Sequence, residues 1–127
     1  MTDHLRPTQA ELEILQVLWK CGASTVKQVN EYLNEKKPRG YTTTLKLMQI
    51  MAEKGLVDRT ADGKMHIYTA RYAEDQVKKS VVSSLVDQVF EGAAMELVIQ
   101  ALGNYKPSHE EISELKSLLD QLENNQK

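Results

Sequence analysis

The stretch that decides the fold runs from Tyr41 to Leu56, YTTTLKLMQIMAEKGL, and continues directly into Val57 to Ala70, VDRTADGKMHIYTA. Apolar residues recur at helical spacing in the first part, and the spacing changes to alternation after Gly55. We predict a helix that begins near Thr42, with threonine as its N-cap, and ends at Gly55. One side of it is expected to be buried, formed either by Leu45, Met48 and Ala52 or by Thr44, Met48 and Met51.

A turn signal divides the second part of this stretch into two strands. Leu56 to Thr60 and Met65 to Thr69 lie on either side of Ala61-Asp62-Gly63-Lys64. An Asp-Gly pair between such runs is a strong hairpin signal, because both residues tolerate positive φ angles. The sequence therefore predicts a β-hairpin directly after the helix.

Two further helices are predicted upstream. Thr8 to Glu11 and Thr25 to Gln28 each have the spacing of a capping box at a helix N-terminus. Apolar residues at helical spacing follow each box, and the helices end at Gly22 and before Pro38. Three helices and then a hairpin is the element order of a winged helix-turn-helix, so the predicted fold is mainly α with a small β-hairpin wing.

From residue 73 onward the apolar pattern is helical only. Three amphipathic stretches follow one another, and the last opens with a capping box from Ser108 to Glu111. Three short aliphatic helices make a poor independent core, so they either pack on the first domain or pair with a second chain. We predict pairing, with residues 1–72 as a winged-helix DNA-binding domain and residues 73–127 as a helical dimerisation domain.

The apolar stripes of the second part are broad, which favours an interlocked two-fold dimer. The final stripe also resembles the a and d positions of a coiled coil. The residues predicted to form the dimer interface are Val81, Leu85, Leu97, Val98, Ile112, Leu115, Leu119 and Leu122.

Charge is distributed unevenly between the two predicted domains. The whole chain has a net charge of −2. Residues 1–72 carry eleven Lys and Arg against eight Asp and Glu, a net of +3, whereas residues 73–127 carry five against ten, a net of −5. Exposed charges are screened over about 8 Å at physiological salt, so the acidic part does not cancel a local basic face. This distribution permits binding to nucleic acid.

Several function classes lack their motifs in this sequence. There is one cysteine, Cys21, and the three histidines are scattered, so no metal or cofactor site is expected. The glycines are isolated, and no nucleophile has an evident base, so we do not expect an enzyme. Without an apolar run of about 18 residues or a signal peptide, we expect a cytoplasmic protein that does not bind membranes. Cys21 is read as a structural residue at a helix end, with a redox switch as the alternative.

A helix of about four turns fits the major groove of DNA and presents its N-terminal residues to base edges. Thr42, Thr43, Lys46 and Gln49 are predicted to face DNA, with Lys46 suited to guanine or phosphate and Gln49 to adenine. The remaining candidates are cations expected to contact backbone phosphates. They lie before the helix, at Lys36, Lys37 and Arg39, and on the hairpin, at Arg59 and Lys64.

Two segments of this chain resemble the penicillinase-repressor family of the BlaI, MecI and CopY type. They are LRPTQAELEILQVLWKCGASTVKQVNEYL and YTTTLKLMQIMAEKGLV, the second with its hairpin, and the similarity extends from Leu5 to Leu122. The resemblance implies a dimeric winged-helix transcriptional repressor that occupies a palindromic operator. In that family a membrane sensor protease often starts release by cleavage within the dimerisation domain. The Asn-Phe cleavage pair is absent from the matching stretch, Val98 to Leu102, and so is the cysteine-rich tail of the copper-responsive members.

The leading hypothesis is therefore a homodimeric, sequence-specific repressor that binds double-stranded DNA. The alternative, from a different class, is a winged-helix module that binds a protein and not DNA. The net acidity of the chain favours the alternative, and the helix–hairpin order with its basic candidates favours the repressor. The dependence of duplex binding on salt distinguishes the two hypotheses.

Overall fold

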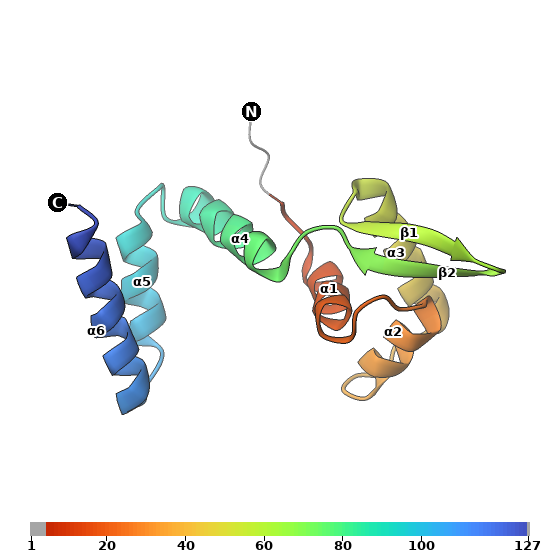
Figure 1. Ribbon diagram of the computed structural model, residues 1–127, viewed down its shortest axis with the longest axis horizontal. Coiled ribbons are helices and arrows are strands. Elements are labelled where there is room, and N and C mark those ends of the chain that lie inside the picture. Colours follow the sequence, from red (N-terminus) through yellow and green to blue (C-terminus); the bar gives the residue numbers. More distant parts are fainter. Residues whose placement is uncertain (1–4, 127) are drawn as a thin grey trace. The chain divides into compact units, whose positions relative to one another are not determined.

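The computed structural model of the protein describes residues 5–126. Within this range, residues 5–84 and residues 85–126 form two compact units. The predicted fold class, mainly helical with one hairpin, is confirmed (Figure 1). In order, the elements are α1 (Gln9–Cys21), α2 (Val26–Asn34), α3 (Tyr41–Lys54), β1 (Val57–Asp62), β2 (Met65–Ala70), α4 (Glu74–Val89), α5 (Ala94–Gly103) and α6 (His109–Asn124).

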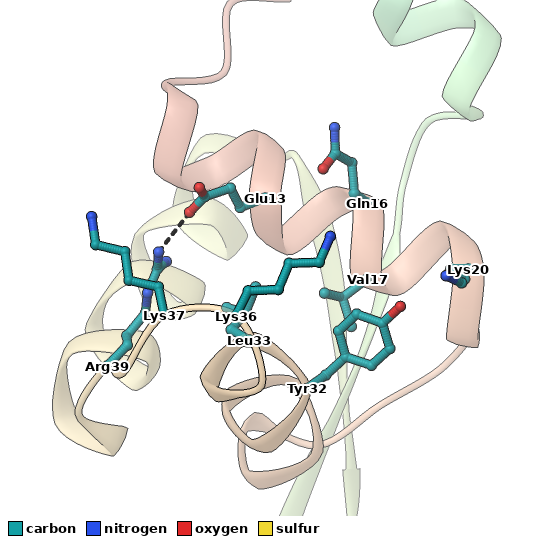
Figure 2. Close-up of a pocket in the computed structure, with 9 residues that line it drawn as sticks. All are labelled: Glu13, Gln16, Val17, Lys20, Tyr32, Leu33, Lys36, Lys37 and Arg39. Carbon is teal, nitrogen blue, oxygen red and sulfur yellow. Dashed lines mark hydrogen bonds and ion pairs between the residues drawn. The ribbon is translucent and has the colours of Figure 1, made fainter.

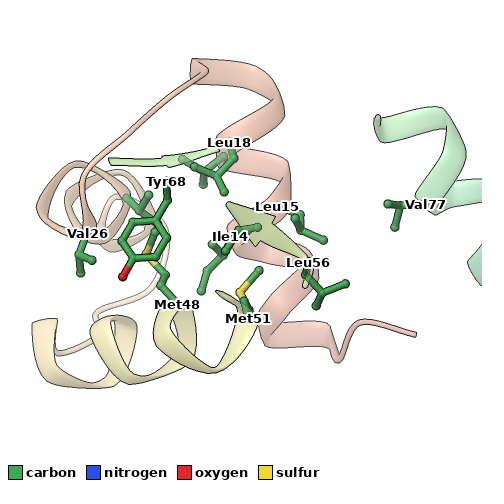
Figure 3. Packing of buried hydrophobic residues seen from close by; sticks show 12 residues of the cluster. Ile14, Leu15, Leu18, Val26, Met48, Met51, Leu56, Tyr68 and Val77 are labelled. Carbon is green, nitrogen blue, oxygen red and sulfur yellow. The ribbon is translucent and has the colours of Figure 1, made fainter. Parts of the chain in front are cut away.

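The core of the first unit is built where α1, α2, α3 and the hairpin meet (Figure 3). Ile14 and Leu15 on α1, Val29 on α2 and Met48 on α3 are almost completely removed from solvent. Burying one such side chain stabilises the fold by about 1.5–3 kcal/mol. The rest of the buried apolar cluster consists of Val17, Leu18, Val26, Met51, Leu56, Val57, Tyr68 and Val77.

All three predicted capping boxes are present. Thr8, Thr25 and Ser108 each accept a hydrogen bond from the backbone N–H three residues later, and the Glu or Gln at that position accepts from the cap. Each box satisfies two of the backbone donors that a helix N-terminus leaves without intrahelical partners. The starts of α1, α2 and α6 are therefore encoded locally.

The hairpin is attached to the helices through its second strand. β1 and β2 pair antiparallel, with Arg59 opposite Tyr68. On its other side, Tyr68 forms a two-bond bridge with Ser24, with N–H to O=C distances of 2.8 and 3.0 Å. The phenol ring of Tyr68 is buried in the core, so backbone and side chain together fix the base of the wing.

The turn of the hairpin lies one residue later than predicted. β1 extends through Asp62, and the register pairs Asp62 with Met65, so the two turn residues are Gly63 and Lys64. Gly63 has φ = +65°. Only the first central residue is left-handed, as in hairpin turns of type II′, which place glycine there. Asp62 therefore ends the strand and does not occupy a left-handed position.

The second unit contains the end of α4 together with α5 and α6. Glu91 and Gly92, both with positive φ, end α4, and the Gly92 N–H donates to the Val86 carbonyl at 3.0 Å. Neither α5 nor α6 contains a buried residue. Among residues 5–126, no helix combines the length and the apolar character needed to cross a membrane.

Candidate nucleic-acid interface

Helix α3 has a buried side and an exposed side. Thr44, Met48 and Met51 are fully buried, which is the second of the two buried sets that the sequence allowed; Leu45 and Ala52 are only partly buried. The four residues predicted to read DNA are all exposed, namely Thr42, Thr43, Lys46 and Gln49. We call this set the α3 face. It presents two hydroxyls, an ammonium group and an amide, all of which can bond base edges or phosphates.

The start of α3 differs from the prediction. The N-cap is Gly40, in an extended conformation, and no side chain caps the helix. The predicted cap, Thr42, was wrong because the helix begins one residue before it, at Tyr41. The Thr42 and Thr43 side chains therefore lie within the first turn, where neither is used as a cap. The first backbone N–H groups carry the positive end of the helix dipole, which favours an anion such as a phosphate.

A buried amide fixes the turn that leads into α3. Asn30 on α2 donates from Nδ2 to the Arg39 carbonyl at 3.0 Å and to Thr44 Oγ1 at 2.8 Å. Its Oδ1 accepts from Asn34 Nδ2 at 3.1 Å, and the Asn34 side chain in turn accepts from the Arg39 backbone N–H. This network connects the end of α2, the turn and the first turn of α3. It sets where the α3 face begins relative to α2.

Arg39 is held by a partner within the chain. Its Nη2 lies 2.6 Å from Glu13 Oε1 on α1, and only 15% of its side chain is exposed (Figure 2). The sequence placed this guanidinium among the phosphate contacts, but in the structure it connects the α2–α3 turn to α1. Lys36 and Lys37, from the same prediction, are exposed. Lys36 extends toward α1, whereas Lys37 extends away from Tyr32 and Lys20 (Figure 2).

The wing carries the other two predicted cations. Arg59 is exposed on β1 and lines a polar hollow together with Gln49 and Glu53 of α3. This brings one wing residue next to the α3 face. Lys64 is exposed at the hairpin turn. The two predicted groups of contacts, one on α3 and one on the wing, thus belong to the same compact unit.

An ion pair closes the other end of α3. Lys54 Nζ lies 2.9 Å from Glu11 Oε2, and the Glu11 side chain is 2% exposed. Burial acts to raise the pKa of Glu11, but the hydrogen bonds from Lys54 and from the Thr8 backbone, with the charge of Lys54, bring that pKa below its ordinary value. Glu11 therefore caps α1 and anchors α3 at the same time.

Several residues that shape the interface were missed by the sequence reasoning. Asn30 has an ordinary polar pattern, and Glu11 was predicted only as part of the capping box; only the tertiary contacts show that both are buried. Tyr41 is 50% exposed as the first residue of α3, beside the face that was predicted. Its position immediately after Pro38-Arg39-Gly40 was a usable signal, since a helix can begin directly after such a segment.

Three helices with a hairpin attached at Ser24, and an exposed polar face on the third helix, define the winged-helix fold. Comparison with solved structures agrees. The chain matches the solution structure of the DNA binding domain of the repressor BlaI with a TM-score of 0.52 and 22% identity, covering 60% of this chain and 93% of that one. It matches a MarR family protein from Bacillus stearothermophilus with a TM-score of 0.53 and 20% identity, covering 96% of this chain and 76% of that one.

The sequence comparisons identify the family. The profile of the penicillinase repressor family matches residues 7–121, so the chain belongs to that family. A relative named penicillinase repressor, from Bacillus licheniformis, is 25% identical over 120 residues, which is 94% of each chain. The methicillin resistance regulatory protein MecI of Staphylococcus aureus is 24% identical over 113 residues, 89% of this chain and 92% of MecI. The resemblance found in the sequence is thereby confirmed.

Proposed function

We propose that the protein is a transcriptional repressor that binds double-stranded DNA in a sequence-specific manner as a homodimer on a palindromic operator. The observation that carries the proposal is the α3 face, which is polar and exposed while the opposite side of the same helix is buried in the core. Relatives named penicillinase repressor and a structural neighbour described as a DNA binding domain support the same function.

The α3 face and the wing take separate roles in this proposal. Lys46 and Gln49 reach base edges in the major groove and determine the preferred sequence. Lys64 at the hairpin turn and Lys37 before α3 contact backbone phosphates, which determine orientation and most of the salt dependence. Arg39 holds the turn through Glu13 and does not contact DNA directly.

The homodimer is proposed from the apolar surface of the second unit. Leu119 is 61% exposed, Ile99 60% and Val89 62%, and a hollow between α5 and α6 is lined by Leu102 and Leu118 among others. A monomer that exposed so many large aliphatic groups on so few residues would lack a core for this unit. A second copy supplies the missing apolar surface and places two α3 faces about one helical turn of DNA apart, or a multiple of it.

Titration of duplexes from the promoter region upstream of the protein's own gene, followed by fluorescence anisotropy at moderate salt, tests the function. We expect a duplex with two half-sites to bind more tightly than one half-site or a scrambled duplex of equal length. Equal binding of all three duplexes would reject sequence-specific repression. Salt-insensitive capture of a protein partner, without duplex binding, would support the protein-interaction module instead.

A further inference from the structure

A basic pocket lies on a part of the winged-helix unit that shares only Lys37 with the proposed DNA contacts. Its volume is about 270 Å³, and its nine lining residues come from α1, α2 and the turn after α2 (Figure 2). It contains none of the α3 face. Its cations are Lys20, Lys36, Lys37 and Arg39, and the single carboxylate among the lining residues is Glu13.

The charges of this pocket are not balanced from within. Glu13 is already paired with Arg39 at 2.6 Å, which leaves the lysines without a carboxylate among the lining residues. Lys20 instead lies over the ring of Tyr32, with its Nζ 5.7 Å from the ring centroid. Lys36 extends toward the middle of α1, and its amine lies apart from Lys20 (Figure 2). Four cations and one carboxylate therefore line the pocket. This surplus of positive charge favours an anion.

The pocket also has features suited to an organic ligand. Val17 and Leu33 provide apolar surface, and Tyr32 provides an aromatic ring. Gln16 also lines the rim, and in this view its amide points away from Tyr32 and Leu33 (Figure 2). Ligand sites in proteins combine apolar walls with a few polar groups, and at about 270 Å³ this pocket lies just below their usual range of about 300–1,000 Å³.

Arg39 couples this pocket to the α3 face. Its side chain lines the pocket, while its backbone N–H and carbonyl are bonded to Asn34 and Asn30 in the network that fixes the start of α3. An anion in the pocket competes with Glu13 for the Arg39 guanidinium. Once that ion pair is replaced, α1 no longer holds the turn, and the start of α3 is less firmly positioned.

We propose that this pocket binds a small organic anion, bearing a carboxylate or phosphate on an apolar body, and that its occupancy weakens DNA binding. The proposed anion binding depends on the pocket alone. The proposed weakening of DNA binding rests on the proposed function, and it assigns an effector site to a repressor whose sequence lacks the Asn-Phe cleavage pair.

The binding half is tested on the full chain without DNA. Phenyl phosphate is titrated into the isotope-labelled protein at constant ionic strength, with benzyl alcohol as the uncharged probe. We expect saturable amide shifts around Lys20, Tyr32 and Lys36, and none with benzyl alcohol. Lys20→Gln should weaken phenyl phosphate binding about tenfold, as expected for one lost charge-assisted hydrogen bond. Lys79→Gln is the matched control, because it removes the same charge from an exposed site on α4.

Non-saturating shifts, or equal weakening by Lys20→Gln and Lys79→Gln, would overturn the proposal that the pocket binds an anion.

The proposed effect on DNA binding is tested by adding phenyl phosphate to the protein–duplex complex. Duplex affinity should fall for the wild type but not for Lys20→Gln, which should bind duplex normally without the probe. If Lys20→Gln binds duplex more weakly than the wild type in the absence of phenyl phosphate, the pocket is a DNA phosphate contact, and the proposal is overturned. If no duplex is bound at all, the repressor function fails, while the titration without DNA still decides the pocket.

Discussion

Removal of the Asn30 side chain tests whether the buried network positions α3, the helix proposed to read DNA. Asn30→Ala removes three hydrogen bonds, two donated to Arg39 and Thr44 and one accepted from Asn34. Thr44 keeps only its longer contact to the Gly40 carbonyl at 3.4 Å, and Asn34 is exposed and can bond water. With about 0.5–1.5 kcal/mol per bond, the free energy of unfolding should fall by about 2–3 kcal/mol.

The assay can be confined to the first unit, because the only tryptophan, Trp19, is half-buried there and donates from Nε1 to the Tyr72 carbonyl at 3.0 Å. Trp19 fluorescence should show a midpoint lower by about 10–20 °C, at roughly 4–8 °C per kcal/mol for a unit of this size. Asn34→Ala is the graded comparison and should lose about 1 kcal/mol, since its side chain is exposed. Duplex affinity, measured well below the midpoint, should fall with Asn30→Ala.

Three results would contradict this reasoning. A change below about 0.5 kcal/mol for Asn30→Ala would mean that water or a rearranged turn replaces the network. Equal destabilisation by Asn30→Ala and Asn34→Ala would mean that burial of Asn30 contributes nothing beyond its exposed neighbour. Unchanged duplex affinity together with the expected loss of stability would mean that the network stabilises the fold but does not position α3 for DNA binding.

Four further outcomes are expected. Glu11→Gln should lower the free energy of unfolding by about 1 kcal/mol at neutral pH. Because the folded-state pKa of Glu11 is below its ordinary value of 4.5, this difference between the variant and the wild type should disappear as the pH falls through the folded-state pKa. Urea titrations at several pH values measure it. Gly55→Ala should destabilise by about 1–2 kcal/mol in thermal unfolding, because the residue has φ = +83°, which is strained for alanine. Leu119→Glu should yield monomers in sedimentation at micromolar concentration with unchanged helix content; a persistent dimer would remove this residue from the interface. Lys46→Ala should relax sequence preference, whereas Lys64→Ala should weaken all duplexes alike and lower the salt slope by about one; identical behaviour of the two variants would contradict the separate roles.

The local parts of the fold were predictable because their signals are local. Each capping box involves residues three apart, and each appears in the structure as the sequence suggested. The change from helical to alternating spacing after Gly55 likewise predicted α3 and the hairpin. The boundaries were less certain, since Gly40 caps α3 without a side chain and Asp62 continues the strand.

The parts that could not be predicted depend on contacts between distant residues. Glu13 and Arg39 are 26 residues apart, and nothing in either neighbourhood indicates the ion pair that removes Arg39 from the set of exposed cations. Glu11 and Lys54 are 43 residues apart. Spacing along the chain showed which face of α3 is polar, but only the tertiary structure showed which cations are already paired.

The bridge between Ser24 and Tyr68 divides the wing into an anchored base and an unsupported tip. Residues Thr60–His66 lie beyond the bridge and are all exposed, with only the opposite strand for support. Insertions, deletions and charge changes at the tip should therefore reduce the stability of the first unit only slightly, whereas the residues at the base are constrained by the core. If the tip contacts the DNA backbone as proposed, mutation there can change the strength of DNA binding while the sequence preference set by α3 is inherited unchanged.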